Sequence, residues 1–342
     1  MKKLIALFVV LTMAISMSAC TGTADTSSTA STADSSIKPV TLTIYSPGND
    51  NSVPTKTIVE YAKLVKEASN GAITLTVHSS GELGNDAEAI ESTRMGTIDI
   101  IFAGTSGFTA FYDKAKLYDL PFLFKDAESA YNIVNSDIGE EVFSGIAKYN
   151  LVFLAEGDNG MRQISTTNRA VHTAADIKGL KLRVPTSQMY LDVWQALGAN
   201  PVSLSLNELA PALSNGTVEG QDNATYHEVA NATYDNIKYF SYINYMWMGC
   251  TMAVNSTSWG KLDPQVQTIL KEQAVVAAKY SFDTIAADNI TAAETMKAAG
   301  VTFDESPDIQ SFKTMLDIPS YYTRYAQETW YDQATIDAIL AK

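Results

Sequence analysis

Apolar and polar residues follow two periods along the chain from residue 40 onward, one typical of helices and one of strands. Residues 53–69 and 87–95 carry apolar side chains at steps of three and four, and each run stops within two residues of a glycine. Strands are expected before, between and after these helices, at residues 41–45, 73–78 and 98–103. This order predicts a parallel sheet with right-handed crossover connections.

The second half continues the alternation. Helices are expected at residues 127–135, 189–197 and 207–214, and strands at 151–156, 180–184, 201–204, 239–245 and 252–255. A much longer helical pattern begins at Pro264 and meets no strong stop until Gly300, which fits one long helix or two nearly continuous ones. At a rise of 1.5 Å per residue, about 35 residues would span about 50 Å. We therefore expect this pattern to run across two lobes.

One arginine lies inside a strand pattern. In residues 180–184 the side chains of Leu180, Leu182 and Val184 alternate onto one face, which leaves Lys181 and Arg183 on the other. Arg183 is the last polar side chain before Pro185 closes the strand. The C-terminal ends of strands in an open α/β sheet border the ligand crevice. A guanidinium matches a carboxylate with a planar fork of donors. Arg183 is therefore a candidate carboxylate anchor, and the alternative is a surface arginine with its stem along apolar neighbours.

A second arginine, Arg162, follows a turn-like segment at residues 159–161. Two roles stay open for it, contact with a ligand and ordering of the turn around Asn159. Together with Arg169 and Arg183, it places three arginines within 22 residues of a chain that is short of positive charge.

Length and charge narrow the class of protein. A chain of 342 residues suits two domains, and 46% apolar with 18% charged residues is ordinary for a globular protein. The formal charge of −14 argues against nucleic acid as a partner, because phosphates require lysine and arginine.

The N-terminus has the pattern of a lipoprotein signal peptide over residues 1–20: two lysines, an apolar run too short for a committed membrane span, and small residues before Cys20. We expect cleavage before Cys20, lipid on its thiol and a Ser/Thr-rich tether at residues 21–38. The alternative is an ordinary signal peptide cut near Ala19. Loss of the two lysines changes the formal charge to −14 − 2 = −16. The mature protein is expected outside the cytoplasm, lipid-anchored to a bacterial membrane, in the periplasm or on the outer face of the cell membrane.

The sequence predicts no metal, no cofactor and no enzymatic activity. Cys250 has no partner for an intramolecular disulfide once Cys20 is assigned to lipid. The three histidines are far apart, and residues 227–231 (HEVAN) lack the second histidine of the zinc-protease motif. Nucleophile-elbow, dinucleotide and phosphate-loop motifs are absent from the sequence. An enzyme acting on small organic acids through scattered side chains stays open as an alternative.

Six segments carry a family resemblance. They are residues 81–84 (GELG), 96–99 (GTID), 119–124 (DLPFLF), 179–185 (GLKLRVP), 196–201 (ALGANP) and 219–223 (EGQDN). In this order they resemble the extracytoplasmic solute-binding proteins of tripartite ATP-independent periplasmic (TRAP) transporters, the DctP-type family, from about residue 40 to about residue 303.

The resemblance implies a two-lobed α/β fold of the periplasmic-binding-protein kind. Each lobe would hold a mainly parallel sheet flanked by helices, with hinge strands and one long helix spanning both lobes. The implied first lobe comprises residues 39–159 and about 249–288, and the second comprises residues 160–248 and about 289–342.

The resemblance also assigns roles to residues. Arg183 would clamp the substrate carboxylate, Arg162 would assist it, and Asn223 would contact the ligand, although Asn223 could instead cap a following helix. Ala224 stands where the family commonly has proline, so the loop after Asn223 is expected to differ.

Further lining residues are expected by analogy and from their polarity. They are Asn49 in the loop after the first strand, the aromatic pair Tyr245 and Trp247, and Gln188. The aromatic pair could equally be core. Polar neighbours suit a hydroxylated acid, so a sugar acid is favoured over a C4-dicarboxylate.

The implied partners are a small organic acid and the membrane subunits of a TRAP transporter, with the binding protein itself a monomer. The alternative within the same fold is an organic-anion binding protein that serves an ABC importer or a sensor.

Overall fold

A computed structural model describes residues 37–328 and 331–342. The expected signal peptide, its Cys20 and all but the last two residues of the expected tether lie outside the described residues. In the described part of the chain, no helix combines the length and the apolar character that crossing a membrane requires.

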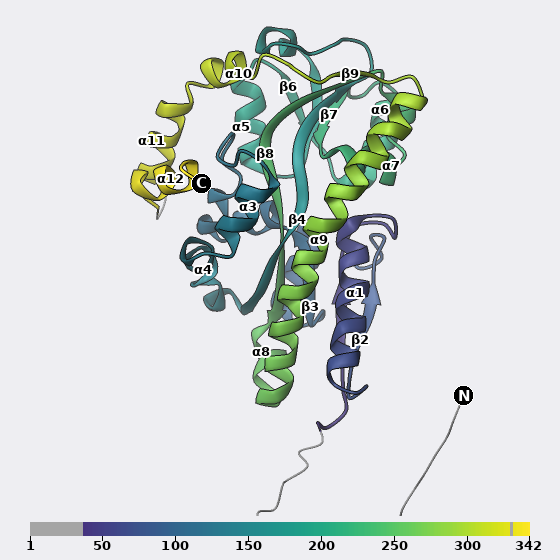
Figure 1. The fold of residues 1–342 in the computed structure, drawn as a ribbon, viewed down its shortest axis with the longest axis vertical. Coiled ribbons are helices and arrows are strands. Elements are labelled where there is room, and N and C mark those ends of the chain that lie inside the picture. The colour runs from purple at the N-terminus through teal and green to yellow at the C-terminus, as the bar shows by residue number, and fades with distance from the viewer. Residues whose placement is uncertain (1–36, 329–330) are drawn as a thin grey trace, which may run out of the picture. The chain divides into compact units, whose positions relative to one another are not determined.

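The described residues form one mixed α/β sheet with helices packed around it (Figure 1). The strand order is β2-β1-β3-β8-β4-β7-β5-β6, and β9 pairs with β8. The strands are β1 (Val40–Tyr45), β2 (Ile73–His78), β3 (Ile100–Gly104), β4 (Leu151–Thr166), β5 (Lys181–Val184), β6 (Asn200–Ser203), β7 (Gly220–Asn223), β8 (Tyr239–Asn255) and β9 (Thr302–Asp304). The α-helices are α1 (Val53–Ala68), α2 (Asp86–Met95), α3 (Ala127–Val134), α4 (Asp137–Phe143), α5 (Gln188–Ala196), α6 (Leu206–Ser214), α7 (Thr225–Ala230), α8 (Ser256–Gly260), α9 (Pro264–Ala298), α10 (Ile309–Leu316), α11 (Ile318–Glu328) and α12 (Gln333–Leu340).

The two ends of the sheet form two lobes. In the first lobe β1 lies between β2 and β3 and is parallel to both, as the sequence predicted. In the second lobe β5 lies between β6 and β7 and is parallel to both. Helix α1 packs on the first lobe and buries its apolar face, which includes Ile58, Tyr61 and Val65. The helix begins here because Ser52 caps its N-terminus and Pro54 fits its first turn.

Two long antiparallel strands, β4 and β8, connect the lobes (Figure 1). The sequence-based prediction was wrong here: it ended the first of these strands at residue 156, with a turn after it, and divided the second into two. Three register shifts, at residues 153–155, 158–160 and 162–164, interrupt the alternation of β4 and hide its continuity. Gly160 lies at the middle bulge with φ of 97°, where a Cβ would come within 2.6 Å of Ala224 Cβ.

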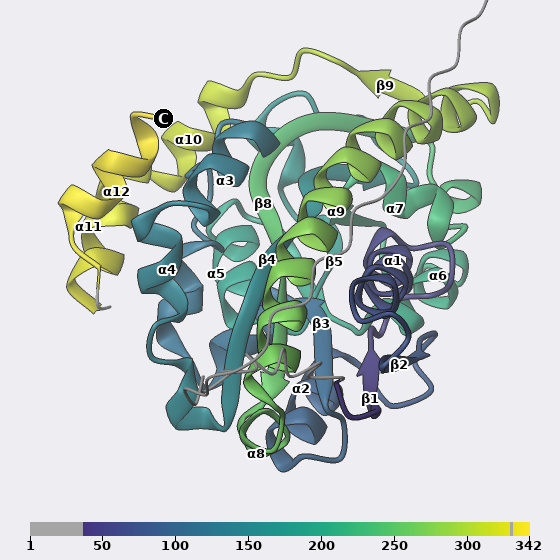
Figure 2. The same cartoon turned by 60° about the horizontal axis from the view of Figure 1, so that its bottom comes forward.

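Helix α9 is a single helix of 35 residues, which is one of the two possibilities that the sequence left open. Asp263 caps it, Pro264 begins it, and its buried small residues include Ala274, Ala277 and Ser281. It packs along β4 and contacts α1 of the first lobe and α7 of the second, so it spans both lobes (Figures 1 and 2). The exact lobe boundaries stay a prediction.

Candidate ligand-binding site

A cavity of about 340 Å³ lies where the two lobes meet. The first lobe contributes Asp86 and Ser106 to its wall, and β4, β5 and β7 contribute Arg162, Arg183 and Asn223. A smaller hollow of about 70 Å³ adjoins it and shares part of the wall. Larger surface grooves elsewhere on the described residues lack a pair of buried arginines. The cavity volume is in the range of small-molecule sites.

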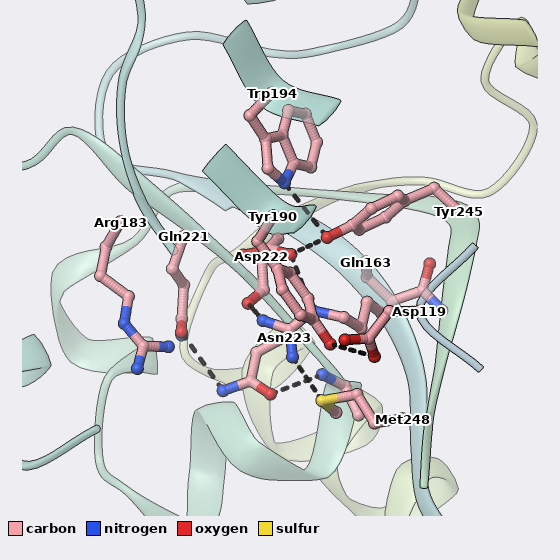
Figure 3. Close-up of polar contacts among 12 residues, drawn as sticks. Asp119, Gln163, Arg183, Tyr190, Trp194, Gln221, Asp222, Asn223, Tyr245 and Met248 are labelled. Atoms are coloured by element: carbon pink, nitrogen blue, oxygen red, sulfur yellow. Dashed lines mark hydrogen bonds and ion pairs between the residues drawn. The ribbon is translucent and has the colours of Figure 1, made fainter. Parts of the chain in front are cut away.

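Arg183 brings an unbalanced positive charge to the cavity. Its strand buries Leu182 and Val184, and its own side chain is only 3% exposed. Its Nε donates to the Leu204 carbonyl oxygen at 3.0 Å, and its two terminal nitrogens have no protein partner among the described residues (Figure 3). Burial, with Arg162 nearby, lowers the pKa of Arg183 to about 10. A carboxylate in the cavity would remove this imbalance.

Arg162, in contrast, is already paired. Its Nε lies 2.7 Å from Asp222 Oδ2, one terminal nitrogen donates to the Asp222 carbonyl oxygen, and the other to Met248 Sδ. Its guanidinium carbon lies 4.7 Å from the centre of the Tyr190 ring. Burial alone would lower the pKa of Arg162, but Asp222 outweighs it and holds that pKa above its ordinary value. The wall around Arg162 is therefore nearly neutral overall.

Asn223 ends β7 at the cavity wall and is 4% exposed. Its Oδ1 accepts from the Ala224 N–H at 3.0 Å, and its Nδ2 donates to Gln221 Oε1 at a long 3.4 Å. It does not cap the next helix, because Ala224 occupies the cap position of α7. The amide thus stays at the cavity rather than at the helix end.

Comparison with known proteins decides the family. The family described as bacterial extracellular solute-binding protein, family 7 (DctP), matches residues 46–328. The chain belongs to this family. The resemblance carried by six segments of the sequence is thereby confirmed.

Two relatives of this solute-binding protein are known by their ligands. The present chain is 27% identical over 257 residues to the 2,3-diketo-L-gulonate-binding periplasmic protein YiaO of Escherichia coli K12, and the match covers 75% of this chain and 78% of that protein. It is 26% identical over 248 residues to the C4-dicarboxylate-binding periplasmic protein DctP of Rhodobacter capsulatus, covering 72% and 74%.

A solved structure agrees in fold. The TRAP periplasmic solute-binding protein of Polaromonas sp. JS666 bound to D-erythronate matches with a TM-score of 0.81 and 26% identity, over 88% of this chain and 98% of that one. The two-lobed architecture predicted from the resemblance is confirmed.

Tyr245 and Trp247 of the solute-binding protein lie behind the cavity wall instead of lining it. Both are fully buried. The Tyr245 hydroxyl donates to Asp222 Oδ2 and accepts from Trp194 Nε1 at 3.1 Å (Figure 3). The Trp247 indole donates to Asp158 Oδ1 at 2.7 Å. Tyr245 thus orients Asp222 of β7, the acid that pairs with Arg162, and Trp247 orients Asp158 of β4.

Asn49 and Gln188 also lie outside the cavity lining. Asn49 Nδ2 donates to the Ala230 carbonyl oxygen at 2.9 Å and to Asn231 Oδ1 at 3.0 Å, so it joins the first lobe to the end of α7. Gln188 is exposed and donates to Asp192 Oδ1 at 2.8 Å. Its position at the start of α5 turns its side chain along the helix surface. Asn49 fits a role in lobe closure, whereas Gln188 has no place at this cavity.

Among the lining residues that the sequence analysis missed are two buried ionisable side chains, Asp119 and His227. Asp119 is 2% exposed, and burial raises its pKa to about 7, although Arg162 opposes the shift. His227 is also buried, and burial with both arginines nearby lowers its pKa to about 3, so it is neutral. Its Nε2 donates to Asn159 Oδ1 at 2.9 Å. The sequence held one signal for a role of Asp119, which is that this charged residue begins an otherwise apolar turn at residues 119–124.

The described residues contain no group of three or more histidine, cysteine, aspartate or glutamate side chains that could hold a metal ion.

Proposed function

We propose that this solute-binding protein captures a small hydroxylated organic acid, a sugar acid rather than a C4-dicarboxylate, as its lobes close. The protein then delivers the acid to a TRAP-type secondary transporter. In this proposal the protein works outside the cytoplasm as a monomer, held to the membrane by lipid on Cys20, and leaves its ligand chemically unchanged.

The observation that carries the proposal is the state of Arg183. Its guanidinium is buried, and its terminal nitrogens are without a protein partner in the described part of the chain. Two parallel N–H donors match the two oxygens of a carboxylate, and such charge-assisted bonds strengthen where water is excluded. A neutral sugar or a cation would leave the guanidinium unpaired, which is costly in a buried site. An organic anion is the ligand that fits.

The rest of the wall supports a hydroxylated ligand. Asn159, Ser205 and Asn223 line the cavity with groups that exchange hydrogen bonds with hydroxyls. The E. coli relative binds a keto sugar acid and the Polaromonas protein holds D-erythronate, whereas the Rhodobacter relative binds C4-dicarboxylates. The two ligand classes differ in their second carboxylate, for which the cavity has no second unpaired cation among the described residues.

The test is a binding screen on the purified chain without its first 20 residues. D-Glucuronate, D-galactonate, D-erythronate, succinate, L-malate and a neutral sugar are each scanned by thermal shift, and the hits are titrated by calorimetry. We expect sugar acids to raise the melting temperature, succinate to act weakly and the neutral sugar not at all. A protein that no acid stabilises would refute the proposal. Recovery of the ligand unchanged, measured by NMR, checks that the protein does not act on it.

Delivery and anchoring need separate tests. Mass spectrometry of the protein from its native host should find a diacylglycerol-modified Cys20 at the mature N-terminus. A Cys20→Ala variant should be released from the membrane fraction. Uptake of the ligand should require two multi-span membrane subunits and no ATPase.

A further inference from the structure

Asp119 lies on the cavity wall with an acceptor that nothing satisfies. It is 2% exposed, and its Oδ1 is 3.4 Å from the Tyr190 hydroxyl, a weak contact at best (Figure 3). Its Oδ2 is buried and has no hydrogen-bond partner among the described residues. A buried acceptor without a partner costs free energy, so a donor from a ligand would be favoured there.

The two arginines on the cavity wall differ in how they are paired. Arg162 and Asp222 cancel each other through their 2.7 Å ion pair. Arg183 remains as the one unpaired cation that the described residues bring to the wall. Asp119, the half-buried Asp86 and the exposed Glu88 are acids on the same wall. One carboxylate of a ligand balances Arg183, whereas a second carboxylate would face acids instead of a cation.

We propose that Asp119 determines specificity: it accepts a hydrogen bond from a ligand hydroxyl and repels a second carboxylate. The inference rests on the proposed function and adds the residue that separates its two ligand classes. A hydroxyl both donates and accepts, so it fits Asp119 whether or not the acid is ionised. A carboxylate only accepts and fits Asp119 only when that acid carries a proton.

The test compares Kd values for D-glucuronate and fumarate, a dianion without hydroxyls, in wild type and in Asp119→Asn. The asparagine keeps the size and removes the charge. We expect glucuronate to bind a few-fold more weakly to the variant, because a neutral amide oxygen still accepts from a hydroxyl but without the charge, and fumarate to bind a few-fold better, because the repulsion is removed. The ratio of the fumarate Kd to the glucuronate Kd should therefore fall by about tenfold or more.

Asp158→Asn is the matched control. Asp158 is also a buried acid with one unpartnered oxygen and a pKa of about 7, but it does not line the cavity. The Asp158→Asn substitution should leave the ratio of the fumarate Kd to the glucuronate Kd unchanged. The inference would be overturned by an unchanged Kd ratio in Asp119→Asn, or by the same change of the ratio in both variants. In either case, glucuronate binding by the wild-type protein would still support the proposed function. A folded wild type that binds neither acid removes the proposed function and this inference together.

A measurement on wild type alone covers the case in which Asp119→Asn does not fold. Lowering the pH from 8.5 to 6 protonates Asp119, so the preference for glucuronate over fumarate should fall at least severalfold. The groups that face Asp119 are Tyr190 on α5 and Arg162 and Glu156 on β4, and Glu156 is held by hydroxyls away from the cavity. A preference that does not change between these pH values would overturn the inference.

Discussion

Replacing Arg183 with methionine separates ligand binding from stability. In the ligand-free protein the buried guanidinium is costly: burial and the nearby Arg162 lower its pKa from 12.5 to about 10, which corresponds to roughly 3 kcal/mol against the charged form. The substitution removes that cost and also removes the hydrogen bond to the Leu204 carbonyl oxygen, worth about 1.5–3 kcal/mol. The two terms nearly cancel, so the free energy of unfolding should change little.

Binding should respond very differently. With methionine at position 183, the ligand carboxylate would enter a buried site with no cation to pair with it, a loss of about 3–5 kcal/mol. We therefore expect the Kd for the bound acid to rise by at least about 100-fold. The Arg183→Lys variant keeps the charge but loses the planar fork of donors, so its Kd should lie between those of the wild type and of Arg183→Met.

Calorimetric titration gives the Kd values, and urea unfolding of the ligand-free proteins gives the stabilities. Arg324→Met is the control, because Arg324 is exposed and stacks on Tyr321 away from the cavity. It should alter neither quantity. A folded Arg183→Met variant with an affinity near that of wild type would refute the anchor role, and a large loss of ligand-free stability would show that the residue is structural instead.

Three further outcomes are expected. Arg162→Met, unlike Arg183→Met, leaves the buried Asp222 carboxylate unpaired and should reduce the free energy of unfolding by about 3–5 kcal/mol in urea titration; an unchanged stability would contradict the pairing. Asn49→Ala removes two hydrogen bonds between the lobes, each worth about 0.5–1.5 kcal/mol, so stopped-flow should find faster ligand release, and an unchanged rate would exclude a role in closure. Burial raises the pKa of Glu156 to about 8 and of Asp158 to about 7, so these two acids bind more protons in the folded state than in the unfolded state between about pH 4 and pH 8. His227, with its pKa lowered to about 3, opposes them only below its ordinary pKa of 6.5. Stability should therefore fall as the pH rises through this window, and calorimetry should record a higher melting temperature at pH 5 than at pH 8; the opposite order would show that these acids are ionised in the folded protein.

Sequence patterns located most helices and strands because burial of one face leaves a local trace. The run before Gly300 became α9, and the alternation at residues 180–184 placed Arg183 opposite the buried face of β5. The pattern failed along β4, where bulges break the period of two. It also failed for β8, which is buried along nearly its whole length and so has no polar face to mark its period.

Within the site, sequence and structure contributed different facts. The local pattern of the sequence predicted the long helix and an arginine at the end of a strand, because these depend on residues close together in the chain. The two-lobed fold was predicted only through the family resemblance. Only the tertiary structure decided that Arg162 is neutralised while Arg183 is not, because Asp222 lies 60 positions further along and reaches Arg162 through strand pairing. Tertiary structure likewise brought Asp119 to the wall and set Tyr245 behind it. Charge balance and access to a cavity are properties of neighbours in space, and the local pattern of a chain holds no record of them.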